Sequence, residues 1–257
     1  MPNEQKVLKL KGQSKRRSAP YPLGEIPASL AVEIGKHIVH RLAVGQVDIT
    51  GDDFGGIFAK AISGTHRGKP LGIADVELES CAWSVKTVQD QNPFAQTSIR
   101  VISGRNSPVY SSGIENPLTD IQATGAAVLK VWNARLNESL NEHDDLRIFI
   151  MVRNMSTLEF TLMEIEPVRF VPPEYTWQKN KNGNLLGYDD RNEHRFTWQP
   201  HGSQFTVLHH IPASAYRFRI IKRPGMLSEE QVLRLSRFDE SWIQPVTLAA
   251  VVPLKTS

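Results

Sequence analysis

The stretch 72–88, GIADVELESCAWSVKTV, constrains the fold more than any other part of the chain. Its first half alternates apolar residues with acidic ones, among them Asp75 and Glu77, which is typical of a strand with one polar face. After a short polar break, a second alternating run carries Ser84 and Lys86. The pattern predicts a hairpin that brings Asp75 and Lys86 together at one edge of a sheet.

A carboxylate beside a lysine on neighbouring strands has a definite chemistry. The carboxylate can hold a divalent metal ion, and the ammonium can stabilise charge that develops on a phosphate. The alternative is a half-exposed hairpin whose charged face meets water. Both interpretations fit the alternating pattern alone.

The residues at these positions also resemble a known motif. Asp75 followed by Ser84-Val85-Lys86 resembles the PD-(D/E)xK nuclease motif, in which an Asp on one strand and an acid-x-Lys triplet on the next surround Mg²⁺. Ala74 stands where a proline often is, and Ser84 stands where the second acid usually is. A serine-x-lysine version occurs in a small group of type II restriction endonucleases.

The resemblance covers roughly 33–153 and implies roles for the hairpin residues. Asp75 would bind Mg²⁺, and the backbone carbonyl of Val85 would add an oxygen ligand. Lys86 would orient or activate the attacking water and steady the phosphate. Ser84 would at best hydrogen-bond a metal-bound water, so a further acid is needed.

Several acids are candidates to complete this metal site. Glu77 shares the face of Asp75, and we count it with Asp75, Ser84 and Lys86 as catalytic. The others lie on predicted helices or a loop, where an exposed, solvated acid is the alternative interpretation; they are Glu33, Asp53 and Glu115.

The order of periodic segments predicts an α/β (α+β) fold with a mixed central sheet built from 72–170. Helical spacing of apolar residues and capping signals predict three flanking helices. The segment 98–103 alternates like a third strand of this sheet, and the nearly continuous apolar run 146–152 suits its centre. The predicted helices are 28–42, 52–63 and 117–140. The resemblance implies a restriction endonuclease-like core.

Composition changes divide the chain into three parts. Residues 1–24 are basic and end in prolines, which predicts a flexible arm, either a solvated tail or a segment that follows a phosphate backbone. The nuclease-like core is predicted at 25–171. The part 172–257 is rich in strand and turn signals, and we expect it to pack on the same core.

The C-terminal part interleaves aromatic residues with basic ones, which favours DNA recognition. Such donors read base edges in the major groove. The alternative is a β-rich lobe with an aromatic core and solvated charges. The candidate DNA-binding residues, one of them from the earlier turn at 104–113, are Arg105, Lys179, Lys181, Arg195, His201, Gln204, Arg217 and Arg219.

The net charge of +3 and the pI near 9.0 permit a polyanion partner without demanding one. The single cysteine, Cys81, excludes an internal disulfide and a cysteine zinc cluster, which fits a reducing cytoplasm. No apolar run approaches a membrane span. We therefore expect a cytoplasmic, Mg²⁺-dependent endonuclease acting on double-stranded DNA, as a homodimer if the resemblance holds. The alternatives are a non-catalytic DNA-binding module on a degenerate nuclease fold and a purely structural or protein-interaction domain.

Overall fold

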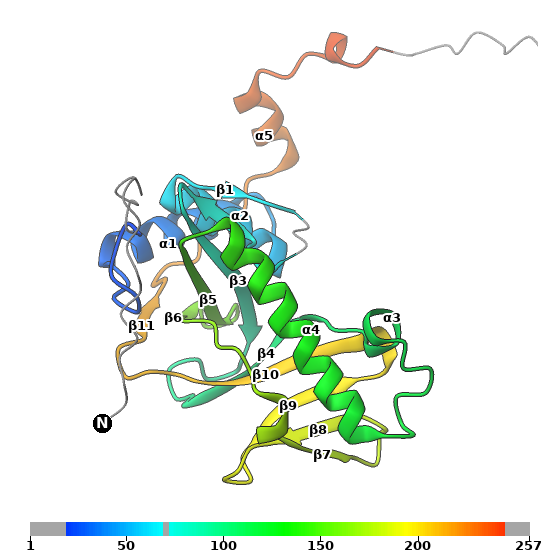
Figure 1. The fold of residues 1–257 in the computed structure, drawn as a ribbon. Coiled ribbons are helices and arrows are strands. Elements are labelled where there is room, and N and C mark those ends of the chain that lie inside the picture. Colours follow the sequence, from blue (N-terminus) through cyan, green and yellow to red (C-terminus); the bar gives the residue numbers. More distant parts are fainter. Residues whose placement is uncertain (1–18, 69–71, 245–257) are drawn as a thin grey trace, which may run out of the picture.

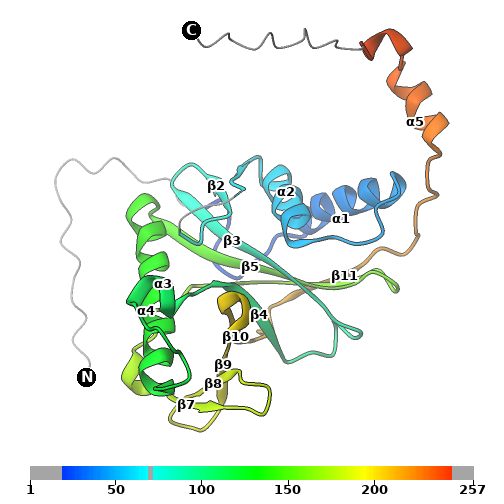
Figure 2. The same ribbon diagram turned by 90° about the vertical axis from the view of Figure 1, so that its right-hand side faces the viewer.

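The computed structural model describes residues 19–68 and 72–244. In this part of the chain the protein is an α+β fold with two β-sheets, named sheet A and sheet B (Figure 1). Helices cover both faces of sheet A, as the second view shows most clearly (Figure 2). The prediction of an α+β protein with a mixed sheet is confirmed.

Sheet A has six strands in the order β1-β2-β3-β5-β6-β11. β3 and β5 run parallel, with Cys81 opposite Asp145, and all other neighbours are antiparallel. Parallel neighbours need a crossover connection, and α4 (Ile121–Glu142) lies in the segment that joins them. The strands are β1 (Thr65–His66), β2 (Val76–Leu78), β3 (Cys81–Gln89), β5 (Asp145–Asn154), β6 (Glu159–Ile165) and β11 (Tyr216–Arg219).

Sheet B is antiparallel, in the order β4-β10-β9-β8-β7. It combines a strand from the middle of the chain with four from the C-terminal part, while β11 joins sheet A. The two predicted parts of the chain therefore exchange strands. The strands of sheet B are β4 (Ser98–Arg105), β7 (Thr176–Lys179), β8 (Leu185–Tyr188), β9 (His194–Gln199) and β10 (Gln204–His210).

The prediction that 98–103 is a strand is confirmed, but its place in the central sheet is wrong. β4 alternates buried and exposed residues, which suits an edge strand with one face in water. β5 is buried at every residue from Leu146 to Arg153, so it takes the central place beside β3 that β4 would otherwise occupy. β4 pairs with β10 instead.

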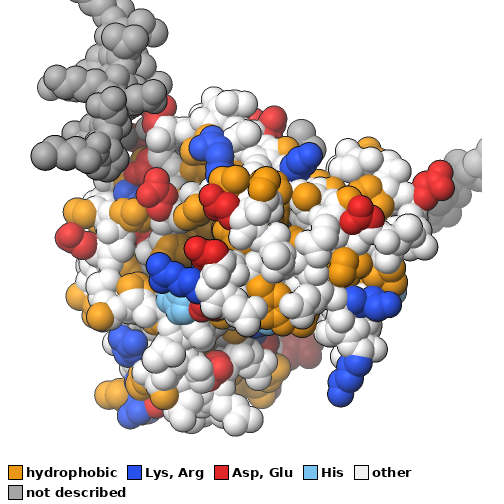
Figure 3. Space-filling model, turned by 60° about the horizontal axis from the view of Figure 1, so that its bottom comes forward, with side chains coloured by type: hydrophobic (Ala, Val, Ile, Leu, Met, Phe, Trp, Pro, Cys, Tyr) orange, Lys and Arg blue, Asp and Glu red, His pale blue; other side chains and the backbone are white. Residues whose placement is uncertain are grey.

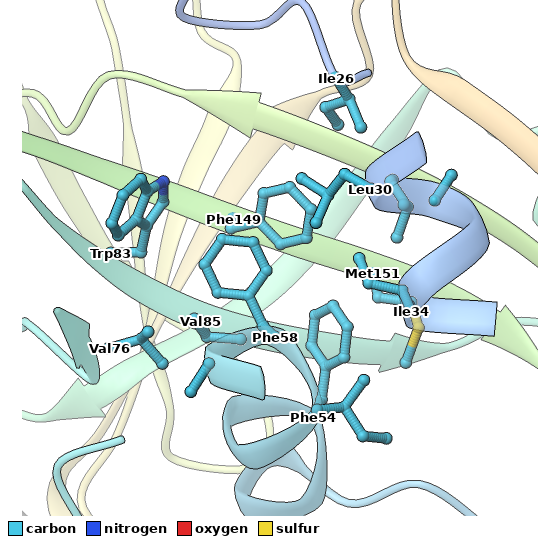
Figure 4. Close-up of a cluster of buried hydrophobic side chains, with 14 of the residues drawn as sticks. Ile26, Leu30, Ile34, Phe54, Phe58, Val76, Trp83, Val85, Phe149 and Met151 are labelled. Carbon is cyan, nitrogen blue, oxygen red and sulfur yellow. The ribbon is translucent and has the colours of Figure 1, made fainter. Parts of the chain in front are cut away.

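One face of sheet A is covered by α1 (Ala28–Ala43) and α2 (Gly51–Ile62). Both begin within a residue of the predicted starts. Phe58 of α2 stacks on Phe149 of β5, with ring centroids 4.3 Å apart, and meets Trp83 of β3 edge-on (Figure 4). The apolar stripe of α1 points into the same core, as its helical spacing predicted; it consists of Leu30, Ile34, Ile38 and Leu42.

The other face of sheet A meets α4 and sheet B. Trp132 of α4 packs against Phe205 of β10, and Gly125 allows the indole of Trp177 to lie against the helix. α4 begins at Ile121 and not at the predicted Pro117. The reason is Asp120, whose side chain accepts a hydrogen bond from Ala123 N and caps the helix there.

Residues 1–18 of the predicted arm lie outside the described residues. The last part of that arm, 19–24, packs on sheet A and is not free. Tyr21 is buried, its hydroxyl donates to Glu164, and Gly24 N donates to the same carboxylate. Arg147 donates to both Glu164 and the carbonyl of Tyr21, so a buried polar network fastens this segment.

The C-terminal helix α5 (Glu229–Ser236) stands away from the rest of the molecule in both views (Figure 1, Figure 2). The side chain of Ser228 caps it, and no residue of the helix is buried. None of the helices in the described part of the chain is long and apolar enough to cross a membrane. The remaining short elements are α3 (Pro108–Ser112), η1 (Pro172–Glu174), η2 (His201–Ser203) and η3 (Glu240–Trp242).

Candidate active site

The predicted hairpin is confirmed, since β2 and β3 are adjacent antiparallel strands. Val76 lies opposite Trp83, and Leu78 lies opposite Cys81. Asp75, just before β2, extends the pairing by one bond, because its N–H donates to the carbonyl of Trp83 at 2.8 Å. The hairpin therefore aligns Asp75 with the middle of β3.

β2 is short, so the edge of β3 beyond Trp83 has no strand beside it on that side. The carboxylate of Asp75 occupies the first position of this open edge, where Oδ2 accepts a hydrogen bond from Val85 N at 2.9 Å. The N–H and C=O of one strand residue point to the same side. The carbonyl of Val85 consequently faces the edge where Asp75 lies, as the predicted oxygen ligand must.

Lys86 and Ser84 also converge on Asp75. Lys86 Nζ donates to Asp75 Oδ2 at 2.5 Å, and Ser84 Oγ donates to the same oxygen at 3.3 Å. Asp75 and Lys86 are both partly exposed, whereas Ser84 is buried. Ser84 thus orients the carboxylate directly, a contact that the sequence did not suggest.

The Asp75–Lys86 pair lines a cavity of about 360 Å³, called the Asp75 cavity below. Its walls come from the start of α2, the segment after β1, the middle of β3, the end of β4 and α4. The lining includes Asp52, His66, Arg67, Asp75, Val85, Lys86, Thr87, Ile102, Ser103, Gly104 and Arg135.

Sequence reasoning missed four charged or titratable residues of this cavity. Asp52, His66, Arg67 and Arg135 come from three separate elements and connections, and no local pattern links them to Asp75. Asp52 was the easiest to find, because it adjoins Asp53 at a helix start. Its carboxylate lies 3.7 Å from His66 Nε2 and is mostly exposed.

Arg135 joins three segments around the cavity. It donates to the carbonyl of Ser103 at 3.0 Å, to Asn106 Oδ1 at 3.2 Å and to the carbonyl of Gly72 at 3.3 Å. Burial lowers the pKa of Arg135, and the negative charge of Asp75 opposes that shift. Gly104 makes room for the guanidinium, because a Cβ there would lie 2.2 Å from Arg135 Nη1.

The other predicted acids are not gathered at Asp75. Asp53 forms a capping box with Thr50 at the start of α2, and Glu33 pairs with Lys36 on the exposed side of α1. Neither lines the Asp75 cavity.

Glu77 and Glu115 are also elsewhere. Glu77 turns to Arg67 and His143, at 2.7 and 2.9 Å, although it shares the face of Asp75. Glu115 lies on an exposed loop outside the lining of the cavity. Helix capping and ion pairs thus hold three of the four acids that were expected to help Asp75, and the fourth, Glu115, lies on an exposed loop.

The donor set of the cavity suits Mg²⁺, which binds through one or two carboxylates and keeps several waters. Asp75 and the Val85 carbonyl lie on one wall, and Asp52 lies on another. Among the described residues, the one group of three or more acidic, histidine or cysteine side chains with metal-binding proximity does not include Asp75. Asp75, Val85 and Asp52 are therefore the residues that would hold a hard cation here.

The candidate DNA-binding residues separate into distinct places. Arg105 follows the cavity residues of β4 and lies opposite Gln204, with His201 in the adjoining turn. The others are farther along the two sheets. Lys179 and Lys181 lie at the β7–β8 hairpin, Arg195 pairs with Glu193, and Arg217 and Arg219 lie on β11 at the sheet A edge opposite β1.

The face in Figure 3 shows basic side chains scattered among acidic and apolar ones, without a continuous basic surface. Of the predicted DNA contacts, Arg105, Gln204 and His201 lie close together at the end of β4 that follows the cavity residues. Comparison of the chain with protein-family models, curated proteins and solved structures finds no match.

Proposed function

We propose that this protein is a Mg²⁺-dependent endonuclease of the restriction type, which hydrolyses phosphodiester bonds in double-stranded DNA. The observation that carries the proposal is the placement of Asp75 and Lys86, 2.5 Å apart, at an open strand edge inside a cavity. In the alternative, a hairpin with a solvated charged face, nothing requires a carboxylate, a lysine and an open strand edge to line the same cavity. The resemblance of Asp75 and Ser84-Val85-Lys86 to the nuclease motif supports the same function.

The residues of the cavity have different roles in this proposal. Asp75, the Val85 carbonyl and Asp52, which all line the cavity, would hold Mg²⁺. When bound, Mg²⁺ neutralises charge on the scissile phosphate and makes water easier to deprotonate. Lys86 presents a positive charge at the same edge, where it orients the attacking water and stabilises charge that develops on the phosphate.

Cationic side chains in the walls suit a phosphodiester substrate. Arg67 and Arg135 line the cavity, and Arg105 with Gln204 lies beside it at the end of β4. Phosphate contacts by arginine position the backbone, and side chains such as Gln204 and His201 have the donors to meet base edges. We place DNA across the cavity and the end of sheet B.

The proposal includes a homodimer, because restriction-type enzymes that read two-fold symmetric sites commonly cut one strand with each subunit. Light scattering of the protein, free and on duplex DNA, tests this part. A monomer in both samples would contradict the proposed dimer but would not bear on the cleavage chemistry.

A second function follows from Ser84. With serine in place of the second acid, a non-catalytic DNA-binding module with the same cavity is the alternative. Cleavage of plasmid DNA in Mg²⁺ separates the two functions, and salt-sensitive duplex binding in Ca²⁺ separates both from a domain without a DNA partner.

The decisive experiment uses unmodified and modified plasmid DNA with Mg²⁺. Lys86→Ala should abolish cleavage, with a rate loss of about 10²–10³ or more, because a positioned charge stabiliser is removed. Duplex binding in Ca²⁺ should remain largely intact. Lys36→Ala is the matched control, an exposed lysine on the far side of α1 that should cut normally. If Lys86→Ala cleaved DNA at the rate of the unchanged protein, the hairpin would have only a structural role.

A further inference from the structure

A second group of metal-ligating side chains meets at Glu77 of β2, and none of them lines the Asp75 cavity. Glu77 of β2 meets Glu142, the last residue of α4, and His143, which follows it. One ligand atom from each lies within 4.8 Å of the others. We call these three residues the Glu77 cluster.

His143 is the unusual member. Its side chain is only 6% exposed, yet neither ring nitrogen has a hydrogen-bond partner in the structure. Glu77 Oε1 is likewise buried without a hydrogen bond, although it lies 2.9 Å from His143 Nε2. A buried imidazole normally finds a hydrogen bond, because an unpaired buried polar group destabilises the folded protein. The two atoms are close without the geometry of a donor and an acceptor.

Two ligands of one metal ion show this kind of approach. With metal–ligand bonds of about 2.0–2.2 Å, neighbouring ligand atoms in tetrahedral or octahedral sites are about 2.9–3.5 Å apart. The separation of Glu77 Oε1 and His143 Nε2 falls in that range, and Glu142 Oε2 lies 3.8 Å from the same nitrogen. A small rotation of the exposed Glu142 side chain would complete the set.

We propose that Glu77, Glu142 and His143 bind a divalent cation of the Zn²⁺ class. Imidazole together with carboxylate suits Zn²⁺ and its first-row neighbours, whereas Mg²⁺ and Ca²⁺ prefer oxygen ligands alone. Three protein ligands leave a further position for water. The ion would fasten the end of α4 to β2, two residues from Asp75.

Arg67 is the group that competes with such an ion. Its Nε lies 2.7 Å from Glu77 Oε2, and its Nη1 lies 3.4 Å from Glu142 Oε2. The Oε1 atom of Glu77 remains turned to His143. Because Arg67 is about half exposed and also lines the Asp75 cavity, an ion at the cluster would free its guanidinium for that cavity. Arg67 therefore distinguishes an ion site from a plain network of ion pairs.

The proposal does not rest on the nuclease function. It uses neither Asp75 nor Lys86, and its measurement is metal binding and not cleavage. A protein without nuclease activity would still bind Zn²⁺ at the Glu77 cluster, and an active nuclease without this site would still depend on Asp75.

The test is Zn²⁺ binding by isothermal titration calorimetry to the metal-free full chain, with metal analysis after dialysis. Glu142→Gln should weaken the site roughly tenfold or more, since one ligand charge is lost. His143→Asn should abolish it. Arg67→Gln should tighten it, because a competing cation leaves. Glu138→Gln, an exposed acid one turn earlier on α4, is the matched control and should bind like the unchanged protein.

Two results would overturn the proposal. The first is the absence of Zn²⁺ binding to the unchanged protein, or binding that Glu142→Gln and Arg67→Gln leave unaltered. The second is weaker binding in Arg67→Gln than in the unchanged protein, which would mean that the arginine supports the carboxylates as an ion pair only. If circular dichroism shows that His143→Asn fails to fold, Glu142→Gln and Arg67→Gln still decide.

Discussion

Asp75, just before β2, and Glu77, in the middle of β2, are two residues apart on one face, but their surroundings differ. Asp75 accepts its hydrogen bonds from Ser84, Val85 and Lys86, all within the same hairpin. Glu77 meets Arg67 and His143, the second of which follows the distant helix α4. Beside Asp75 the edge of β3 past Trp83 is unpaired and the Asp75 cavity lies there, whereas Glu77 meets His143 at the end of α4.

This difference shows how surroundings can give two neighbouring acids different chemistry. A carboxylate at an open edge can exchange its hydrogen-bond partners for a metal ion. A carboxylate at the end of a helix is held by the side chains there, as Glu77 is by His143. Substitution of Asp75 and substitution of Glu77 should therefore have different effects.

The largest effect is expected at Asp75. Asp75→Ala should abolish Mg²⁺-dependent cleavage, a loss of about 10²–10³ or more, because both the metal ligand and the partner of Lys86 are removed. Duplex binding in Ca²⁺ should persist or tighten, since a negative charge near the phosphate is gone. A gel-shift titration beside the plasmid assay measures both. Cleavage that survived in Asp75→Ala would place the chemistry elsewhere.

A smaller effect of another kind is expected at Glu77. Glu77→Gln should reduce the free energy of unfolding by about 1–2 kcal/mol, because Arg67 and the buried His143 lose a charged neighbour. Cleavage should stay within a few-fold of normal. Urea unfolding measures the change, and Glu33→Gln on the exposed side of α1 is the control that should unfold normally. A loss of cleavage as large as that of Asp75→Ala would contradict the different roles given to Asp75 and Glu77.

The smallest effect is expected at Ser84. Ser84→Ala removes one long hydrogen bond of 3.3 Å to the Asp75 carboxylate, which Val85 N and Lys86 still hold. A hydrogen bond to a charged group is worth about 1.5–3 kcal/mol, and this long one belongs at the low end, so cleavage should fall by roughly tenfold. Single-turnover cleavage rates give the comparison. A loss near that of Lys86→Ala would make Ser84 a member of the reacting group and not a positioning residue.

Much of this arrangement was predictable from local sequence. The alternation around Asp75 and Lys86 predicted the hairpin, and the helical spacing of Leu30 and Ile34 predicted α1. Each rests on the periodicity of apolar residues, which depends only on residues close together in the sequence. The pairing of Asp75 with Lys86 belongs to this class, because a tight turn joins their strands.

Other features depend on tertiary contacts between segments that are far apart in the sequence. The sequence could not show that β4 pairs with β10 in sheet B, that Arg135 lines the Asp75 cavity, or that His143 lies against Glu77. Alternation tells which face of a strand a residue occupies, but not what lies across from that face. That choice depends on how all strands and helices pack into one core. Here β5, buried from Leu146 to Arg153, pairs with β3, and β4 pairs with β10 in the other sheet.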